Sequence, residues 1–223
     1  MKISIIIPVL NESKNIQKVL DSLMIYKSNL HEIILVDGGS HDNTLELISN
    51  YPVILVESAK GRALQQNKGA KIATGELLVF LHADTTLPKT FISDIPPCLS
   101  NNQCWGRFNV KLSGQHFLFR VIEFFMNVRS CITGIVTGDQ CLVVSKELFN
   151  RINGFPEIAL MEDIAISRLL KKISRPICIK SFVITSSRKW EENGIIRTIL
   201  LMWWLRICYF FGVSPKYLVK KYY

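Results

Sequence analysis

The sequence predicts an α/β domain in which helices flank a mostly parallel sheet. Short apolar runs rich in β-branched residues alternate with segments whose apolar residues recur at helical spacing. This alternation is typical of the βα units that build parallel sheets. In addition, acidic turns follow three of the runs, and open α/β sheets bind ligands at the carboxyl ends of their strands.

Four strands and three helices are predicted in the first half of the chain. Ile3 to Val9 is a β-branched run suited to a strand that is buried on both faces. The other predicted strands comprise residues 32–36, 53–57 and 76–81, and the helices lie near residues 16–23, 45–48 and 61–73. We expect Ser40 or Asp42 to cap the second helix and Gly75 to close the third.

The second half is less regular. Strands are predicted around residues 105–112 and 141–144, and helices at 117–128 and 162–172. The helix at 117–128 has a broad apolar face and a polar side formed by Arg120, Glu123 and Asn127. Because no repeat or linker divides the chain, we predict one domain over residues 1–190.

Residues 191–223 are predicted to form an apolar and basic helical extension. Arg197 and Arg206 lie on opposite faces of the expected helix at 195–211, and these charges disfavour a lone transmembrane span. Two alternatives stay open. The helix lies on a membrane surface, or it packs on the core or in a homodimer.

The composition indicates a folded, basic protein. The chain has 223 residues and a net charge of +9, which favours anionic partners such as nucleotides or an acidic membrane surface. Its basic residues match no recognition motif, so we do not expect nucleic acid as a partner. The six cysteines form no CxxC pair and are expected to be free in a reducing cytoplasm. Without a recognisable export signal, we expect a cytoplasmic protein, with peripheral contact to the inner face of the membrane.

Asp84 is the most informative single residue. It follows the apolar run at 77–81, so a buried strand delivers its carboxylate to the edge of the sheet. Glu12 and Asp37 follow two other predicted strands, whose ends gather along the same edge. Carboxylates there can bind Mg²⁺ or Mn²⁺, or accept hydrogen bonds from a base or ribose. Gly38 lets a ligand approach the backbone closely.

Two helix starts carry further charged residues. Arg62 opens one helix, where the guanidinium and the backbone N–H groups suit a diphosphate. Glu162 and Asp163 open another; an acid there is either a general base or a residue favoured by the helix dipole alone. Arg188 either closes over phosphates or anchors the last helix. The GxGxxG and P-loop motifs are absent, which argues against a dinucleotide oxidoreductase and a P-loop kinase.

Taken together, these segments resemble the family 2 inverting glycosyltransferases with a GT-A fold. The matching segments are SIIIPVLNE at residues 4–12, ILVDGGSHD at 34–42, KGRA at 60–63, TGE at 74–76, LHAD at 81–84 and the Glu162-Asp163 pair. A narrower resemblance, to the small arsenosugar-biosynthesis-type transferases, extends to the C-terminus. It rests on GRA at 61–63, FLHADT at 80–85, GDQ at 138–140 and TSSR at 185–188 with Trp190 and Glu191.

The resemblance implies roles for individual residues. Asp163, beside Glu162, corresponds to the catalytic base. Asp84 corresponds to the last position of an Asp-x-Asp metal motif whose first acid is replaced by His82, and an imidazole there favours Mn²⁺ over Mg²⁺. The residues expected at the nucleotide sugar are Pro8, Glu12, Asp37, Gly38, Arg62, Ala83 and Arg188.

We therefore predict an enzyme that transfers a sugar, with inversion, from a nucleotide-diphosphate sugar to an acceptor hydroxyl or phosphate. The donor is expected to be a UDP-sugar. One alternative is a polyprenyl-phosphate glycosyl synthase at the membrane, because residues 117–128 and the Trp-rich C-terminus are apolar. Another is a non-catalytic nucleotide-sugar-binding module, which has no need of Glu162 and Asp163. A nucleotidyltransferase is disfavoured, because no phosphate loop rich in glycine and lysine follows the first strand.

Overall fold

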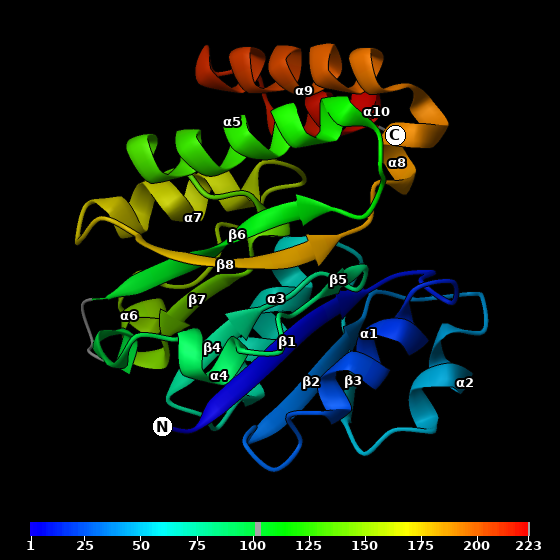
Figure 1. Cartoon of the computed structure of the whole chain (residues 1–223), viewed down its shortest axis with the longest axis vertical. Coiled ribbons are helices and arrows are strands. Elements are labelled where there is room, and N and C mark those ends of the chain that lie inside the picture. Colours follow the sequence, from blue (N-terminus) through cyan, green and yellow to red (C-terminus); the bar gives the residue numbers. More distant parts are fainter. Residues whose placement is uncertain (101–103, 223) are drawn as a thin grey trace.

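The computed structural model describes residues 1–100 and 104–222, which form a single sheet with helices on both faces (Figure 1). The strand order is β3-β2-β1-β4-β7-β6-β8-β5. The strands are β1 (Ile3–Val9), β2 (Glu32–Asp37), β3 (Ile54–Glu57), β4 (Leu77–Phe80), β5 (Thr85–Thr86), β6 (Trp105–Leu112), β7 (Leu142–Ser145) and β8 (Ile177–Thr185). The α-helices are α1 (Ile16–Met24), α2 (Thr44–Ser49), α3 (Arg62–Ile72), α4 (Phe91–Asp94), α5 (Phe117–Thr133), α6 (Lys146–Arg151), α7 (Glu162–Lys171), α8 (Arg188–Asn193), α9 (Ile195–Phe210) and α10 (Pro215–Tyr222). Two 3₁₀ turns, η1 (Pro97–Ser100) and η2 (Gly138–Gln140), complete the list.

The prediction of an α/β fold with a parallel sheet is confirmed for the first half of the chain. β3, β2, β1 and β4 run parallel to one another, as the alternating strand and helix patterns predict. β7 then pairs antiparallel with both β4 and β6, so the complete sheet is mixed. β8 pairs parallel with β6 and antiparallel with the short β5. The apolar patterns predict neither β5 nor β8.

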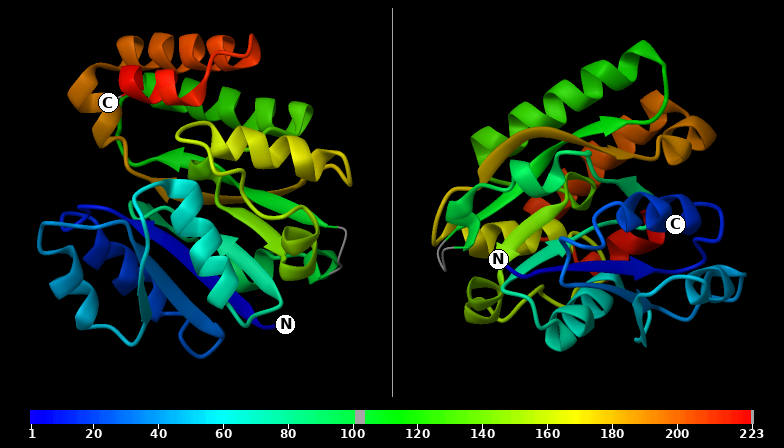
Figure 2. Two further views of the ribbon diagram at one scale, coloured as in Figure 1. Left: turned by 180° about the vertical axis from the view of Figure 1, so that it is seen from behind. Right: turned by 60° about the horizontal axis from the view of Figure 1, so that its bottom comes forward.

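The two faces of β1 enter two separate cores. Ile3, Ile5 and Ile7 face a core shared with α1 and α4, whereas Ile6 faces a core shared with α3, α6 and α7. All four side chains are at most 1% exposed, which explains why β1 reads as a continuous apolar run rather than an alternating one. Figure 2 shows helices on both sides of this part of the sheet.

Helix α3 lies close against the sheet because two of its residues permit it. At Gly69 a Cβ atom would lie 2.5 Å from Ile6 Cγ2 and 3.0 Å from Val36 Cγ2. One turn earlier, the buried Gln65 amide donates hydrogen bonds of 2.8 Å to both Val9 O and Val36 O. These carbonyls lie at the ends of β1 and β2. Helix α3 therefore links the ends of β1 and β2, and the turns that follow these two strands carry Glu12 and Asp37.

Helix α5 turns its polar side toward the sheet. β7 pairs only with the first part of β6, so the later backbone groups of β6 need other partners on that side. Asn127 accepts a hydrogen bond from Val110 N (2.8 Å) and donates one to Val110 O (3.0 Å). Glu123 accepts from Leu112 N (2.6 Å), and Arg120 donates to Leu112 O (2.9 Å). The predicted polar side of this helix thus completes the hydrogen bonding of β6.

As a consequence, much of the apolar side of α5 faces outward, as does much of α9. We call these exposed side chains the α5–α9 surface. It comprises Phe117, Val121, Phe124, Phe125, Val128 and Ile132 of α5 and Ile196, Leu200, Trp203, Trp204, Ile207 and Phe210 of α9. None of the helices in the described part of the chain is long and apolar enough to cross a bilayer.

Two predicted helix signals are wrong in detail. The N-cap of α2 is Asn43 rather than Ser40 or Asp42, although Asp42 Oδ1 accepts a hydrogen bond of 3.1 Å from the following Thr44 N. Helix α3 ends at Ile72, and its C-cap is Ala73 rather than Gly75. Gly75 instead allows the chain to pass close to β1, because a Cβ atom there would lie 2.4 Å from Ser4 Oγ.

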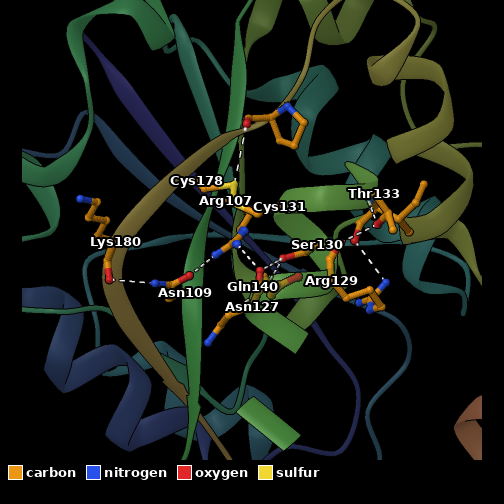
Figure 3. The surroundings of a disulfide bond; sticks show 12 residues. Arg107, Asn109, Asn127, Arg129, Ser130, Cys131, Thr133, Gln140, Cys178 and Lys180 are labelled. Carbon is orange, nitrogen blue, oxygen red and sulfur yellow. Dashed lines mark hydrogen bonds between the residues drawn. A yellow bond between two sulfur atoms is a disulfide. The ribbon is translucent and has the colours of Figure 1, made fainter. Parts of the chain in front are cut away.

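Two cysteines are joined, contrary to the expectation that all six are free. Cys131, near the end of α5, and Cys178, near the start of β8, form a disulfide with a Cα–Cα distance of 6.1 Å (Figure 3). Their 47-residue separation matches no spacing motif, because only the packing of α5 beside β8 brings them together. The other four cysteines are free.

We expect Gly69→Ala to lower the free energy of unfolding by about 1–3 kcal/mol. Alanine is the better helix former, but its methyl group would overlap the buried side chains of Ile6 and Val36. Urea denaturation followed by circular dichroism measures the change. Lys68→Ala, at an exposed position of the same helix, is the control. A Gly69→Ala variant as stable as the control would contradict the close seating of α3.

Candidate active site

A cleft of ≈ 810 Å³ opens beyond the carboxyl ends of β1 and β4 and is walled by residues of α5, α7, α8 and α9. Ligand sites in proteins typically have volumes of about 300–1,000 Å³. Seven of the predicted site residues line this cleft, namely Glu12, Arg62, His82, Asp84, Glu162, Asp163 and Arg188. They come from five separate parts of the chain, so the fold gathers them at one place.

Four predicted residues do not line the cleft: Pro8, Asp37, Gly38 and Ala83. The Asp37 side chain is 2% exposed and serves its own turn. Its Oδ2 accepts a hydrogen bond from Gly39 N (2.8 Å), and its Oδ1 accepts one from Ser40 Oγ (2.6 Å). The contacts of these four residues with a nucleotide stay predictions.

The turn after β1 fixes Glu12 in the cleft. Asn11, with φ 54°, adopts a left-handed conformation that asparagine tolerates better than most residues. Glu12 N then donates to Thr44 Oγ1 (2.8 Å), and Glu12 Oε2 accepts from Asn15 Nδ2 (2.8 Å). Burial raises the pKa of Glu12, and the charge of Asp84 adds to this effect. The carboxylates of Glu12 and Asp84 are therefore close enough to repel each other.

Asp84 lies in the turn that follows β4, and two hydroxyl groups orient its carboxylate. Thr85 Oγ1 and Thr185 Oγ1 donate to Asp84 Oδ1 at 3.3 and 3.4 Å. The two threonines also contact each other across the β5–β8 pairing, at 2.9 Å. The last strand of the chain thus helps to orient the carboxylate at the end of the fourth.

His82 contacts Asp139, a residue for which the sequence predicts no site role. His82 Nδ1 lies 3.2 Å from Asp139 Oδ1. His82 Nε2 is buried, lacks a hydrogen-bond partner among the described residues, and lies against Gly138, where a Cβ atom would come within 2.2 Å of it. Burial opposes ionisation of Asp139, but the hydrogen bond and charge of His82 outweigh it and lower the pKa of Asp139. In this arrangement His82 orients a second carboxylate, whose side chain is 41% exposed.

The η2 turn that carries Asp139 is held by a buried polar network. Gln140 Nε2 donates to Ser130 Oγ (2.8 Å) and Asn127 Oδ1 (3.3 Å), and Arg107 Nη2 donates to Asn127 O (2.7 Å) (Figure 3). Asp139, in the resemblance segment GDQ, therefore has a defined place in the cleft. The segment GDQ is the sequence signal that points to Asp139, but the resemblance assigns no role to this carboxylate.

Arg62 and Glu162 form an ion pair across the cleft, with 3.2 Å between Arg62 Nη1 and Glu162 Oε1. The Arg62 side chain is 40% exposed, whereas that of Glu162 is 5% exposed. The buried carboxylate therefore orients the guanidinium, which also lines the cleft.

Asp163 is held by two backbone donors. Its Oδ1 accepts a hydrogen bond from Ile164 N (2.8 Å), and its Oδ2 accepts one from Gly138 N (3.2 Å). Burial and the neighbouring charge of Glu162 raise the pKa of Asp163, which makes the carboxylate a stronger base. The preceding residue, Met161, has φ 70°, a strained conformation of a kind that clusters at functional sites.

The C-terminal helices supply one wall of the cleft. Met161 and Ile164, which flank the acidic pair, pack with Leu205 of α9 and Leu218 of α10. The cleft is also lined by Lys189, Trp190, Arg206 and Tyr222 from this region and by Arg129 from α5. The sequence predicts no site role for Lys189, Arg206, Tyr222 or Arg129, because single basic or aromatic residues on apolar helices form no motif.

The donor set fits a divalent cation that is shared with a substrate. Within residues 1–100 and 104–222, no three His, Cys, Asp or Glu side chains gather closely enough to hold a metal ion by themselves. However, Mg²⁺ commonly binds through one or two carboxylates together with phosphate oxygens of the substrate. Glu12, Asp84 and Asp139 all offer carboxylates to the same cleft. A cation bound jointly by these residues and a diphosphate agrees with this arrangement.

The strand order and the acidic cleft define an α/β fold of the GT-A type, and comparison with solved structures confirms it. A mannosyltransferase from Pyrobaculum calidifontis, solved with GDP-Man and Mn²⁺, superposes with a TM-score of 0.63 and 22% identity, covering 82% of this chain and 56% of that one. TarS of Staphylococcus aureus, solved with UDP, gives a TM-score of 0.63 and 21% identity, covering 83% and 60%.

Residues 4–104 match the model of Glycosyl transferase family 2, which supports the resemblance seen in the sequence and the prediction of a transferase enzyme. The glycosyltransferase AglE of Haloferax volcanii is 33% identical over 91 residues, which cover 37% of this chain and 30% of that protein. A dolichol-phosphate mannosyltransferase of Pyrococcus furiosus is 26% identical over 191 residues, covering 81% and 53%. The chain thus spans about half the length, or less, of these curated relatives.

Proposed function

We propose that the protein transfers a sugar, with inversion at the anomeric carbon, from a nucleotide-diphosphate sugar to an oxygen nucleophile of an acceptor. The observation that carries this proposal is the meeting of Asp84, Arg62 and Asp163 in one cleft. The first two suit a diphosphate, and the third suits the removal of a proton. The solved relatives with UDP, UDP-GlcNAc or GDP-Man support a nucleotide-sugar donor, and we place UDP-sugars first.

The charged residues of the cleft would have separate roles in the proposed reaction. Asp84, with either Asp139 or Glu12 as a second carboxylate, would hold a divalent cation together with phosphate oxygens of the donor. When bound, the cation would neutralise the charge that develops on the departing diphosphate. Relatives have been solved with Mn²⁺ or Mg²⁺. Arg62, oriented by Glu162, adds a positive charge at the same place. Arg188 lines the same cleft and would add a further positive charge near the phosphates.

Asp163 acts as the general base. Its raised pKa suits the task, and the backbone hydrogen bonds fix the carboxylate before the acceptor arrives. The acceptor oxygen attacks the anomeric carbon on the face opposite to the diphosphate, so one displacement inverts the configuration. The non-catalytic alternative is disfavoured, since a binding module has no need of a base that is held in place at the cleft.

We expect Asp163→Asn to lower the turnover number by about 10²–10⁴-fold, because the amide cannot take a proton. Binding of UDP should be unchanged, since the amide keeps the shape of the side chain. Release of UDP from UDP-sugars, followed in a coupled assay, measures the loss. Glu157→Gln, at an exposed position on the loop before α7, is the matched control. Turnover of Asp163→Asn at the level of this control would refute the base.

Asp84→Ala should remove the part of UDP binding that depends on Mg²⁺ or Mn²⁺. Isothermal titration calorimetry with and without the metal separates this part from the metal-independent part. Asp94→Ala, at a half-buried carboxylate outside the cleft, should leave both parts unchanged. An Asp84→Ala protein whose affinity for UDP still rises on addition of metal would contradict the proposed role of Asp84.

A polyprenyl-phosphate glycosyl synthase at the membrane is the second candidate. The α5–α9 surface favours it, since twelve large apolar side chains are exposed beside the cleft. The similarity to a dolichol-phosphate mannosyltransferase supports the same reading. In this proposal the protein is cytoplasmic and lies on the inner face of the membrane. A homodimer formed through the α5–α9 surface is the rival occupant. The narrower likeness to arsenosugar-type transferases leaves the acceptor open.

The full-length protein should float with vesicles that contain anionic lipid, and the double variant Phe124→Ser/Trp203→Ser should float much less. Each of these exposed side chains contributes up to about 2–3 kcal/mol when it enters the membrane interface. Ile25→Ser, which removes an exposed apolar side chain far from this surface, is the control. Equal flotation of the double variant and the control would count against membrane contact and leave the dimer.

A further inference from the structure

The cleft has a second cationic region, away from Arg62 and Asp84. Arg129 of α5 and Arg206 of α9 both line the cleft. The charge of Arg206 contributes, after burial, to a pKa of about 10 for Arg129, and Arg206 also acts on Asp163. The two guanidinium groups are therefore neighbours of each other and of the base.

These arginines lack acidic partners. No carboxylate in the part of the chain that the structure describes lies within 4.0 Å of either guanidinium. Arg129 Nη1 makes one long hydrogen bond, of 3.4 Å, to Ile135 O. Arg129 Nη2 is buried and has no hydrogen-bond partner among the described residues. A buried cationic N–H without an acceptor costs free energy, and an anion that enters the cleft would remove that cost.

The walls around this region are apolar. Ile122 and Met126 of α5 pack with Ile199 of α9 and line the cleft together with it. Phe125 and Trp203 also line the cleft, yet both are 64% exposed, so the same wall continues out to the α5–α9 surface. In Figure 1 the two helices run along the same side of the molecule. A ligand that occupies this half of the cleft therefore needs a charged end inside and an apolar chain that extends outward.

We infer that Arg129 and Arg206 form a binding site for the phosphate group of an acceptor that carries an apolar chain, namely a lipid phosphate monoester. This inference rests on the proposed function and names the acceptor class. Two guanidinium groups match the several oxygen atoms of a phosphate, and the apolar wall matches the chain. A neutral lipid alcohol would leave both arginines unpaired, and a soluble phosphate would leave the wall in contact with water.

The site places the phosphate next to Asp163. A phosphate oxygen attacks the anomeric carbon, the bond from that carbon to the diphosphate oxygen breaks, and the nucleoside diphosphate leaves with the electron pair. A phosphate monoester has a second pKa of about 6, so it is partly protonated near neutral pH. Any such proton passes to Asp163. The product is a lipid-linked phosphosugar.

Calorimetry of the full-length protein without any donor tests the site independently of catalysis. We expect farnesyl phosphate, used below its aggregation concentration, to bind at least about tenfold more tightly than farnesol or inorganic phosphate. Arg129→Gln and Arg206→Gln should each weaken farnesyl phosphate by about tenfold or more and leave the weak binding of farnesol unchanged. Arg206→Lys, which keeps the charge, should lose less affinity than Arg206→Gln.

Arg197→Gln is the matched control, because Arg197 lies on the same helix as Arg206 but is exposed and outside the cleft. Farnesol bound as tightly as farnesyl phosphate, or an Arg206→Gln protein with the affinity of the Arg197→Gln control, would overturn the phosphate site. Inorganic phosphate bound as tightly as farnesyl phosphate would overturn the lipid source.

The outcome also separates this inference from the proposed function. If farnesyl phosphate binds through the arginines but no nucleotide sugar binds or reacts, the proposed function fails and the anion site stands. If sugar is transferred to an alcohol while farnesyl phosphate does not bind, the acceptor inference fails and the transferase stands.

Discussion

The proposed donor side of the cleft depends on how closely α3 approaches the sheet. Gly69 lets the helix touch β1 and β2, and this contact brings the Gln65 amide within hydrogen-bonding distance of two strand-end carbonyls. With those ends fixed, the turn that carries Glu12 and the first residue of α3, Arg62, come to the same edge of the sheet. The backbone positions from which Glu12 and Arg62 extend are therefore set by buried contacts that involve no charge.

A different constraint shapes the acceptor side. Because β7 covers only part of β6, the polar residues of α5 are used to complete the hydrogen bonding of that strand. The apolar residues of the helix are left to form the wall of the cleft and its outer surface. Exposed apolar side chains are unfavourable in an isolated soluble domain, but they favour binding if the ligand or the surroundings are apolar. The same helix also supplies Arg129, so one element sets both the polarity and the charge of this half.

The sequence predicts the first half of the fold well because each βα unit there is local. Apolar runs and helical spacing identify β1 to β4 with α1 to α3, and of the acidic residues after these strands Glu12 and Asp84 line the cleft. By contrast, β8, the Cys131–Cys178 pair and the place of Arg129 and Arg206 in the cleft depend on contacts between distant segments, so no local pattern predicts them. For Asp37 the motif predicts a ligand contact, and the structure shows in addition that its carboxylate oxygens accept hydrogen bonds from its own turn.

Met161 links the acidic pair to the last helices of the chain, since its side chain packs against residues of α9 and α10 while its backbone starts α7. During synthesis on the ribosome, the strands and helices of the donor half emerge first and can fold among themselves. The start of α7 gains its packing against Leu205 and Leu218 only once α9 and α10 have emerged and docked. In this order of folding, the wall of the cleft beside the proposed base forms after the strand ends from which Glu12 and Asp84 extend.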